Sequence, residues 1–250
     1  DYLQNQFLHK PDNGVMLRML TKYFDKPQPE PWWKDAYPNT ITRLPQSELP
    51  AGYVDAYRIM TIVIDTSVYM PFLMKMFKDL GGTVVQKAVF NIEEALENHK
   101  VVINCTALGS RELFGDEKVY PVRGQMIKIP KTDFDQVVVD DDGPNCLALV
   151  VARTNDIVLG GTIQENDWDT EIKEQDTAGI LQRVMNIAPQ LKINEITSIS
   201  VGLRPAREVV RLEAEDFSGK IVVHNYGHGG AGFTLSWGCA KEVVDIVDRL

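Results

Sequence analysis

The chain has 250 residues, 44% of them hydrophobic, and is long enough to bury a sizeable core in one large domain or two smaller ones. Its 26 basic and 35 acidic residues give a net charge of −9, and it has no long basic run, which argues against nucleic acid and anionic membranes as partners. The three widely spaced cysteines share no metal-binding spacing with the histidines, so we expect a reducing compartment, no disulfide framework and no metal site.

The first half of the chain is predicted to begin with loops and to continue with alternating strands and helices. Residues 1–56 are rich in Pro, Asn and Gly, so this stretch should be loop-heavy with short helical pieces. The elements expected after it are a strand at 59–64, a helix at 66–80 ended by Gly81 and Gly82, a strand at 83–88, a short helix at 91–99 and a strand at 101–104. This β-α-β order predicts a parallel sheet, in which nucleotide cofactors bind at the carboxyl ends of the strands.

The second half is predicted to contain more antiparallel structure. Gly124–Ile129 alternates with period two, which indicates an antiparallel strand. Residues 194–212 should form two extended runs joined through Arg204–Arg207. The other expected elements are strands at 147–152, 156–161 and 220–224 and helices at 176–187 and 234–250. In the last helix the expected buried stripe consists of Ala240, Val243, Val244, Val247 and Leu250.

The stretch NYGHGGAG, residues 225–232, contains a literal G-x-G-x-x-G made by Gly227, Gly229 and Gly232. A strand before it and a helix after it are the local context of a dinucleotide fingerprint, but residues 233–250 are too few for the second strand of a βαβ unit. One alternative is a tight turn that lets the helix pack closely on its strand. The other is a binding loop, because bare backbone at a helix N-terminus favours an anionic or electron-rich group.

The stretch VGLRPAR places Arg204 and Arg207 on either side of a proline that restricts the backbone. A guanidinium held in this way can bind a carboxylate through two hydrogen bonds. An ion pair with a neighbouring glutamate is the structural alternative.

Together these segments resemble the D-amino-acid oxidase family, which includes D-aspartate oxidases. VGLRPAREVVRLE, followed by VVHNYGHGGAGFTLSWGCA, carries most of the resemblance, and VVINCTALGSREL, PVRGQMIKI and DIVLGGTIQENDWD match the middle of the family in the same order. The similarity extends back to PEPWWKD and covers essentially the whole chain. It implies an α/β fold, in which a Rossmann-like FAD-binding domain with a parallel sheet is interleaved with a mostly antiparallel α+β substrate-binding domain. The expected substrate-binding parts are 1–68 and 125–205, and the expected FAD-binding parts are 69–124 and 206–250.

The resemblance also implies the reaction and its cofactor. Such enzymes use FAD to oxidise a D-amino acid by hydride transfer to flavin N5, the imino acid hydrolyses to a keto acid and ammonia, and O2 is reduced to H2O2. A carboxylate clamp and an amine acceptor beside a flat ring suffice to orient the Cα–H bond, because the cofactor performs the redox step. The implied partners are a small D-amino acid and O2, with a homodimer as an open alternative.

The residue roles are carried over by the same resemblance. Arg204 resembles the arginine that pairs with the substrate carboxylate, and Gly230 the glycine whose carbonyl accepts a hydrogen bond from the substrate amine. The expected cofactor-binding residues are Val89 and Thr106 near the adenine and phosphate ends, Arg211 near the flavin, and Gly229, Gly230, Gly232, Phe233 and Thr234 along the flavin ring and ribityl chain.

Several positions depart from the family pattern. Leu149 and Asn145 stand where the family has tyrosines, and the lost phenolic hydrogen bond to a carboxylate corresponds to about 1.5–3 kcal/mol. Ala107 replaces a glycine and Ala152 a proline. Three alternatives follow: an active D-amino-acid oxidase, which is the leading hypothesis; an oxidase of a secondary or N-methyl amino acid, similar to glycine and sarcosine oxidases; and an inactive fragment or paralogue that acts only by binding.

Three further expectations concern specificity, the cofactor segment and the compartment. Arg58 or Arg153 is a candidate to receive an acidic substrate side chain, and a solvated surface charge is the alternative for each. The family's own FAD fingerprint lies on a first strand that these residues do not include, so we expect a preceding segment or another chain to supply it. The expected compartment is the peroxisome or the cytoplasm, although the final Asp-Arg-Leu is not a peroxisomal Ser-Lys-Leu signal.

Overall fold

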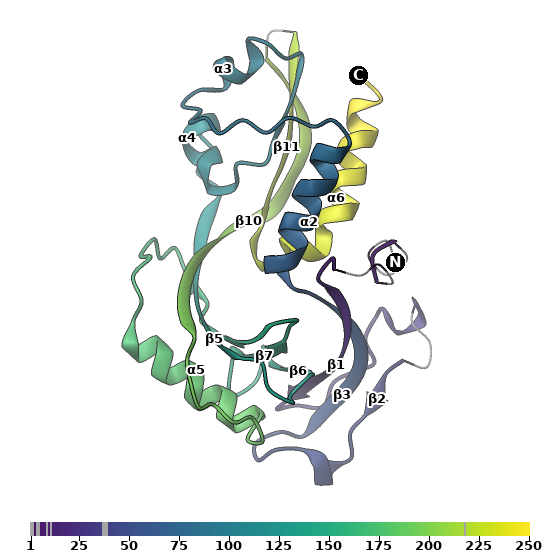
Figure 1. Ribbon diagram of the computed structural model, residues 1–250, viewed down its shortest axis with the longest axis vertical. Helices are drawn as coiled ribbons and strands as arrows, with labels where there is room; N and C mark the ends of the chain where they lie inside the picture. The colour runs from purple at the N-terminus through teal and green to yellow at the C-terminus, as the bar shows by residue number, and fades with distance from the viewer. Residues whose placement is uncertain (1–2, 4–5, 9, 11, 37–39, 218) are drawn as a thin grey trace. The chain divides into compact units, whose positions relative to one another are not determined.

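The structure is a computed structural model that describes residues 1–250 except 1–2, 4–5, 9, 11, 37–39 and 218 (Figure 1). Its internal contacts divide the chain into two compact units. Unit 1 comprises Asp1–Thr83, Gln125–Ile163 and Glu171–Val201, and unit 2 comprises Val84–Gly124, Gln164–Thr170 and Gly202–Leu250.

Unit 1 is built on a mainly antiparallel sheet. Its strands are β1 (Val15–Phe24), β2 (Thr42–Arg43), β3 (Asp55–Ile64), β6 (Val137–Asp140), β7 (Ala148–Ala152), β8 (Asp156–Gly160) and the second part of β5 (Tyr120–Pro130). They lie in the order β2-β3-β1-β6-β7-β8-β5, and all neighbours are antiparallel except the parallel pair β1 and β6. The helices are α2 (Thr66–Asp79) and α5 (Glu174–Ile187), with short 3-10 turns η1 (Lys34–Ala36) and η2 (Gln46–Glu48).

The main core of unit 1 lies between α5 and one face of this sheet. Ile180, Val184 and Ile187 are spaced so that they share one face of α5, and all three are fully buried. They pack in one cluster with alternate residues of the strands, among them Val150, Ile157 and Leu159. Periodicity of about 3.6 in the helix and 2 in the strands therefore produces this two-layer arrangement.

Unit 2 contains a second parallel strand pair. β11 (Lys220–His228) runs parallel to β4 (Val101–Asn104) and antiparallel to β10 (Ser198–Phe217), which begins in unit 1, and β9 (Gln164–Glu165) pairs with the first part of β5. The helical elements are α3 (Ile92–Leu96), η3 (Ala107–Gly109), α4 (Ser110–Phe114), η4 (Gly229–Ala231) and α6 (Gly232–Val247). Figure 1 shows α6 running along β11, against which it packs. Both units together have the expected α/β class, with a mainly antiparallel sheet in unit 1 and both parallel and antiparallel pairs in unit 2.

Most predicted elements exist, but the N-terminal prediction was wrong. The loop-heavy region contains the ten-residue strand β1, which pairs along its whole length with β3. Because β3 pairs with β1 and β2 in antiparallel fashion, it does not begin a parallel β-α-β unit. The predicted strand at 83–88 is also absent, since these residues are exposed and pair with no strand among the described residues.

The predicted buried stripe of the last helix is largely uncovered. Only Val243 is buried in α6, whereas Val244 is 55% and Leu250, beyond the helix, 62% exposed. The periodic pattern correctly indicates a helix, but the described residues cover only the side that faces β11.

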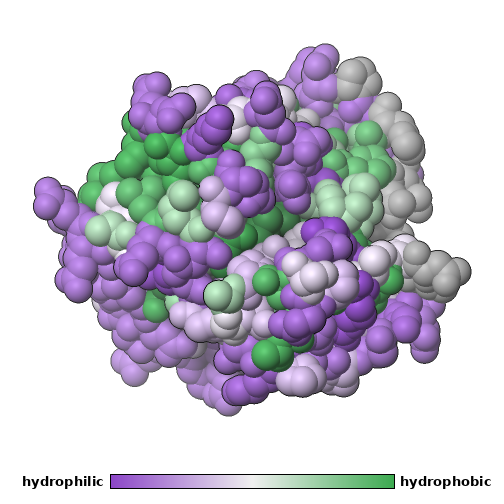
Figure 2. Space-filling model, turned by 90° about the horizontal axis from the view of Figure 1, so that it is seen from below, coloured by the Kyte–Doolittle hydropathy of each residue, from purple (hydrophilic) through white to green (hydrophobic). Residues whose placement is uncertain are grey.

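Apolar residues also reach the surface of unit 1. The face drawn in Figure 2 is mostly hydrophilic, with apolar residues gathered in patches between the charged side chains. In the β1–β3 pair, Met19 lies opposite Met60, and these residues are 39% and 49% exposed. Among the described residues, no helix is both long and apolar enough to cross a membrane.

The unit boundaries differ in detail from the expected domain boundaries. The boundary at 124/125 is shared, whereas α2 belongs to unit 1 and Arg204 to unit 2. The helix belongs to unit 1 because Asp65 caps its first turn and Tyr69 and Phe72 contact the ring of Phe7.

Candidate active site

The glycine-rich stretch follows a longer strand than expected. β11 continues to His228, so Gly227 lies in the strand, and Gly229 begins the η4 turn that leads into α6. Gly227 and Gly229 have φ values of +90° and +55°, a region that only glycine adopts easily. The N-cap of α6, Ala231, makes no side-chain capping hydrogen bond, which leaves the first backbone N–H groups of the helix without a side-chain acceptor.

Arg204 reaches this loop from β10. A Cβ placed on Gly230 would lie 3.6 Å from Arg204 Cδ, so the aliphatic part of the arginine passes directly beside the glycine. Arg204 is half-buried, and burial lowers the pKa of its guanidinium. β10 is one strand rather than two joined runs, and its pairing with β11 is irregular between Ala206 and Arg211, just after Arg204. The structure therefore brings the two predicted catalytic residues together within unit 2.

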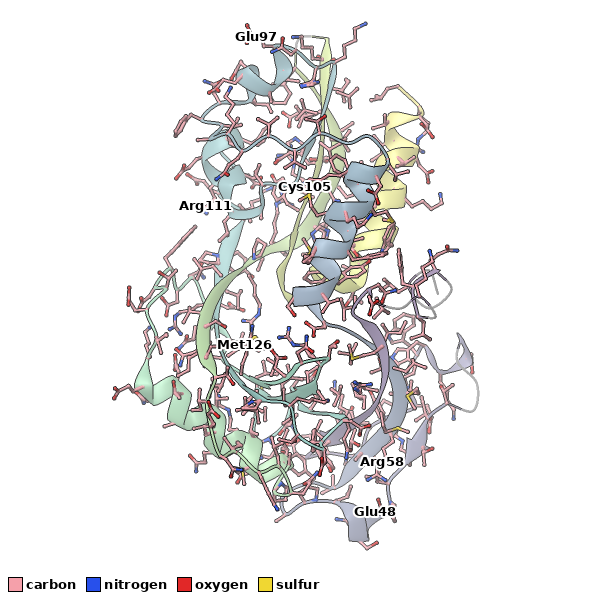
Figure 3. The ribbon with its side chains drawn as sticks, in the orientation of Figure 1. Glu48, Arg58, Glu97, Cys105, Arg111 and Met126 are labelled. Atoms are coloured by element: carbon pink, nitrogen blue, oxygen red, sulfur yellow. The ribbon has the colours of Figure 1, made fainter. Side chains whose placement is uncertain are left out.

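Thr106 lies in the loop that follows β4. Because β4 and β11 are parallel and Asn104 lies opposite His224, this loop and the glycine loop leave the sheet at the same edge. Asn104 Oδ1 accepts hydrogen bonds from Thr106 N at 3.0 Å and Thr106 Oγ1 at 2.7 Å. Cys105, labelled in Figure 3, stands between these two residues and is an exposed free thiol. Asn104, the last residue of β4, is 2% exposed.

A buried histidine supports this loop. Since the Thr106 N–H is a certain donor, Asn104 Oδ1 must be the acceptor, and Asn104 Nδ2 donates to Ser110 Oγ and to His224 Nδ1, each at 3.1 Å. His224 Nδ1 is therefore unprotonated, and its Nε2–H donates to Glu215 Oε2 at 3.0 Å. Burial, with a contribution from Arg211, lowers the pKa of His224, so this tautomer is the stable form at neutral pH.

Arg211 and Arg207 continue this polar network. Arg211 pairs with Glu213 at 2.7 Å and Glu215 at 2.6 Å and donates to Tyr226 Oη at 3.1 Å. Burial alone would lower the pKa of Arg211, but these hydrogen bonds raise it above its ordinary value. The ion-pair partner of Arg207 is not a neighbouring glutamate: Arg207 Nε pairs with Asp116 at 3.1 Å.

Asp116 joins Arg207 to the strand that carries the glycine loop. The carboxylate is 9% exposed and accepts a hydrogen bond from Tyr226 Oη at 2.7 Å in addition to the one from Arg207. Hydrogen bonds from Tyr226 and Lys118, with the charge of Arg207, outweigh burial and lower the pKa of Asp116. The network thus fixes the end of β11 next to the loop.

The other predicted cofactor residues are on the surface of unit 2. Phe233 and Thr234 lie in the exposed first turn of α6, with Phe233 42% exposed. Val89 is 39% exposed in the segment without regular structure before α3.

Three of the four positions that depart from the family pattern lie in unit 1, whereas Ala107 lies in unit 2 at the start of η3. Leu149, on β7 opposite Val139, packs in an apolar cluster with Val63 and Val137. Asn145 is 9% exposed and structural, since its N–H donates to Asp140 and its side chain donates to Tyr53 Oη at 2.8 Å. Ala152, the last residue of β7, is fully buried in the main core.

The two arginines considered for an acidic substrate are already paired. Arg58 Nη1 lies 3.0 Å from Glu48 Oε2, and both side chains are labelled in Figure 3. Arg153 is only 7% exposed, so it is not a solvated charge; it binds Asp156 through two hydrogen bonds and lies 3.5 Å from Asp65. Neither arrangement favours an acidic side chain in the substrate.

The residues of unit 2 fit a dinucleotide cofactor. Backbone N–H groups at the start of α6, the exposed Thr106 loop and the bare glycine backbone all lie beyond the carboxyl ends of two parallel strands. Such an edge accepts phosphates and lets a flat ring approach closely. The sequence analysis did not predict the supporting residues, which are Asn104, Asp116, His224 and Tyr226. Asn104 and His224 end two predicted strands, and this position is the signal that could have indicated them.

Comparison with known proteins agrees with this assignment. Residues 21–246 match the family DAO, described as FAD dependent oxidoreductase. The sequence is 46% identical over 254 residues to a D-amino-acid oxidase of Dictyostelium discoideum, covering 99% of this chain and 72% of that protein. It is 38% identical over 234 residues to a D-amino-acid oxidase of Rubrobacter xylanophilus, covering 93% of this chain and 72% of that protein.

A solved structure shares the fold at much lower identity. Glycine oxidase from Geobacillus kaustophilus superposes with a TM-score of 0.78 at 16% identity, over 99% of this chain and 74% of that one. The family model's match over residues 21–246, with the identity to D-amino-acid oxidases over most of the chain, establishes the family. The chain belongs to the DAO family of FAD-dependent oxidoreductases, and FAD is its cofactor.

Proposed function

We propose that this protein oxidises a D-amino acid with O2 to an imino acid and H2O2, and that water then hydrolyses the imino acid to a keto acid and ammonia. The observation that carries the proposal is the contact between Arg204 and Gly230, which places a cation beside a bare backbone at the start of the η4–α6 segment. Relatives named D-amino-acid oxidase, at 46% and 38% identity, support it.

Arg204 is proposed to bind the substrate carboxylate. A half-buried guanidinium pairs more strongly with a carboxylate than an exposed one does, because the surroundings screen the charges less. The planar fork of arginine also matches the two carboxylate oxygens, which fixes the orientation of the bound acid.

Gly230 is proposed to fix the amine through its carbonyl oxygen. When the carboxylate and the amine are both held, only one enantiomer presents its Cα–H bond in a given direction, so two anchors on one side of the substrate select its configuration. FAD, when bound, accepts the hydride that leaves Cα.

For the cofactor, we propose contacts from Thr106, Gly229, Gly232, Phe233 and Thr234, which are exposed or at the loop described above. Arg211 is a weaker candidate, since Glu213 and Glu215 already pair with its charge. Val89 stays a prediction for the adenine end. A homodimer and a peroxisomal or cytoplasmic compartment also stay predictions.

The test is H2O2 formation by the FAD-loaded protein on a panel of D-amino acids, with the L-enantiomers and secondary or N-methyl amino acids alongside. We expect turnover of D-amino acids with apolar side chains and little turnover of D-aspartate, because Arg58 and Arg153 are paired. Turnover of the secondary amines alone would replace this proposal with the glycine- or sarcosine-oxidase alternative.

The Arg204→Met variant tests the assigned anchor. Two charge-assisted hydrogen bonds at about 1.5–3 kcal/mol each predict a loss of roughly 10²–10⁴ in kcat/KM, with the flavin absorbance retained. Arg249→Met, near the exposed C-terminus, is the matched control. Unchanged kcat/KM in Arg204→Met would remove the central residue of the proposal.

A further inference from the structure

Gly124 occupies an unusual place in β5. Residues 126–129 of this strand alternate between half-buried and buried, as expected for a sheet with one covered face. Arg123, Gly124 and Gln125 interrupt the alternation, because all three are buried. Since neighbouring residues of a strand point to opposite faces, something must cover Gly124 on the face where residues 122, 126 and 128 are only half-buried.

The group that covers Gly124 is the guanidinium of Arg204. A Cβ built on Gly124 would overlap with Arg204 Cζ, Nη1 and Nη2, which are the three nearest heavy atoms to that position. The guanidinium therefore lies in the space that any other side chain at position 124 would occupy. Both residues belong to unit 2.

The backbone gives no other reason for a glycine here. The glycines with positive φ are Gly14, Gly52, Gly81, Gly115, Gly219, Gly227 and Gly229, and Gly124 is not among them. An alanine fits the backbone of a strand at this position, so the requirement is for space and not for conformation. On its other side, Arg204 runs past Gly230, at 3.6 Å from Arg204 Cδ to a Cβ placed there.

We propose that Gly124 is a positioning residue for the proposed reaction, because its missing side chain leaves the space that holds the Arg204 guanidinium where it binds the substrate carboxylate. The inference rests on the proposed function. A side chain at position 124 displaces the flexible end of Arg204 and leaves the strand in place, so it changes substrate binding more than folding.

Steady-state kinetics of the FAD-loaded Gly124→Ala variant test this role. We expect KM for a D-amino acid to rise at least about tenfold, with a smaller change in kcat and unchanged flavin absorbance. Gly202→Ala is the matched control, since it makes the same change two residues from Arg204 where a Cβ would meet nothing within 4 Å. A KM for Gly124→Ala equal to that of Gly202→Ala would overturn the proposal.

A thermal-stability cycle separates this contact from the function itself. Gly124→Ala is compared in the native background and in the Arg204→Ala background, in which the guanidinium is gone. We expect any loss of Tm caused by Gly124→Ala to disappear in the second background. An equal loss in both backgrounds would show that Arg204 does not fill the space and would overturn the inference. If the native protein oxidises no D-amino acid, the proposed function fails, whereas this cycle still tests the contact.

Discussion

Replacing Tyr226 with phenylalanine removes one oxygen atom from the network that supports the glycine loop. Tyr226 is 2% exposed, and its hydroxyl donates to Asp116 Oδ2 at 2.7 Å and accepts from Arg211 Nη1 at 3.1 Å. Hydrogen bonds to charged groups contribute about 1.5–3 kcal/mol each. In the variant, Asp116 still pairs with Arg207, and Arg211 still pairs with Glu213 and Glu215. Because neither charge becomes unpaired, we expect the free energy of unfolding to decrease by about 2–4 kcal/mol in total.

This loss should be visible in thermal unfolding. For a chain of this size, 1 kcal/mol corresponds to a Tm change of about 2–4 °C, so Tyr226→Phe should lower Tm by roughly 5–15 °C. The flavin should also bind more weakly, because Tyr226 immediately precedes Gly227. Both quantities can be followed together, Tm by circular dichroism and flavin affinity by fluorescence titration.

Tyr57→Phe is the control for this experiment. The ring of Tyr57 packs against Phe24 and Trp33, and burial raises the pKa of its hydroxyl, but the structure shows no hydrogen bond from that hydroxyl to the described residues. Its loss should change the free energy of unfolding by less than about 0.5 kcal/mol. If the two variants unfold at the same temperature, the hydroxyl of Tyr226 does not anchor the loop and the reasoning is wrong.

Two further predictions concern pH and the glycine loop. Because the folded-state pKa of His224 is lowered from 6.5, the folded protein binds fewer protons than the unfolded chain, so stability should decrease as the pH falls below about 6.5. His224→Gln should reduce this pH dependence of the unfolding free energy. The remaining dependence comes from His228, whose pKa is also lowered. Gly227→Ala should cost about 1–3 kcal/mol in chemical denaturation from backbone strain, plus a clash, since its Cβ would lie 2.8 Å from Arg207 Cβ. Gly219→Ala, at φ +84° with nothing within 4 Å, measures the strain alone, and an equal loss in both variants would exclude the clash.

Elements with local signals were predictable from the sequence. α2 begins after the capping residue Asp65 and ends before Gly81, whose φ is +88°. These caps act within one helical turn, so a single sequence contains them. β7, β8 and α5 likewise follow from short apolar patterns, because their buried faces are set by spacing along the chain.

Pairing partners could not be predicted in the same way. Residues 83–88 carry a strand-like pattern, yet they form no strand because no described segment pairs with them. β1 is the opposite case. Its neighbourhood is rich in Pro and Gly and predicts a loop, but β3 pairs with all ten residues of β1. A strand requires hydrogen bonds from another segment, and the local sequence does not contain that information.

The site shows the same division between local and distant information. Arg204 and Gly229–Thr234 are recognisable from their motifs, whereas Asn104 and His224 are 120 residues apart in the chain and Asp116 and Tyr226 are 110 apart. Each pair joins through a hydrogen bond that only the parallel sheet and the adjoining loops create. The residues proposed to contact substrate and cofactor are therefore recognisable from local motifs, whereas those that hold them in place are recognisable only in the folded chain.

The glycines of this site serve two different physical purposes. Gly227 and Gly229 provide positive φ values for the turn between β11 and α6, so an alanine there strains the backbone. Gly124 and Gly230 have no such φ and lie on either side of the Arg204 side chain, so an alanine at Gly124 moves the arginine instead. The first kind of substitution should reduce stability and the second should reduce substrate affinity. Measuring Tm and KM for both Gly227→Ala and Gly124→Ala therefore distinguishes a glycine required by the backbone conformation from a glycine required by the space that a neighbouring side chain occupies.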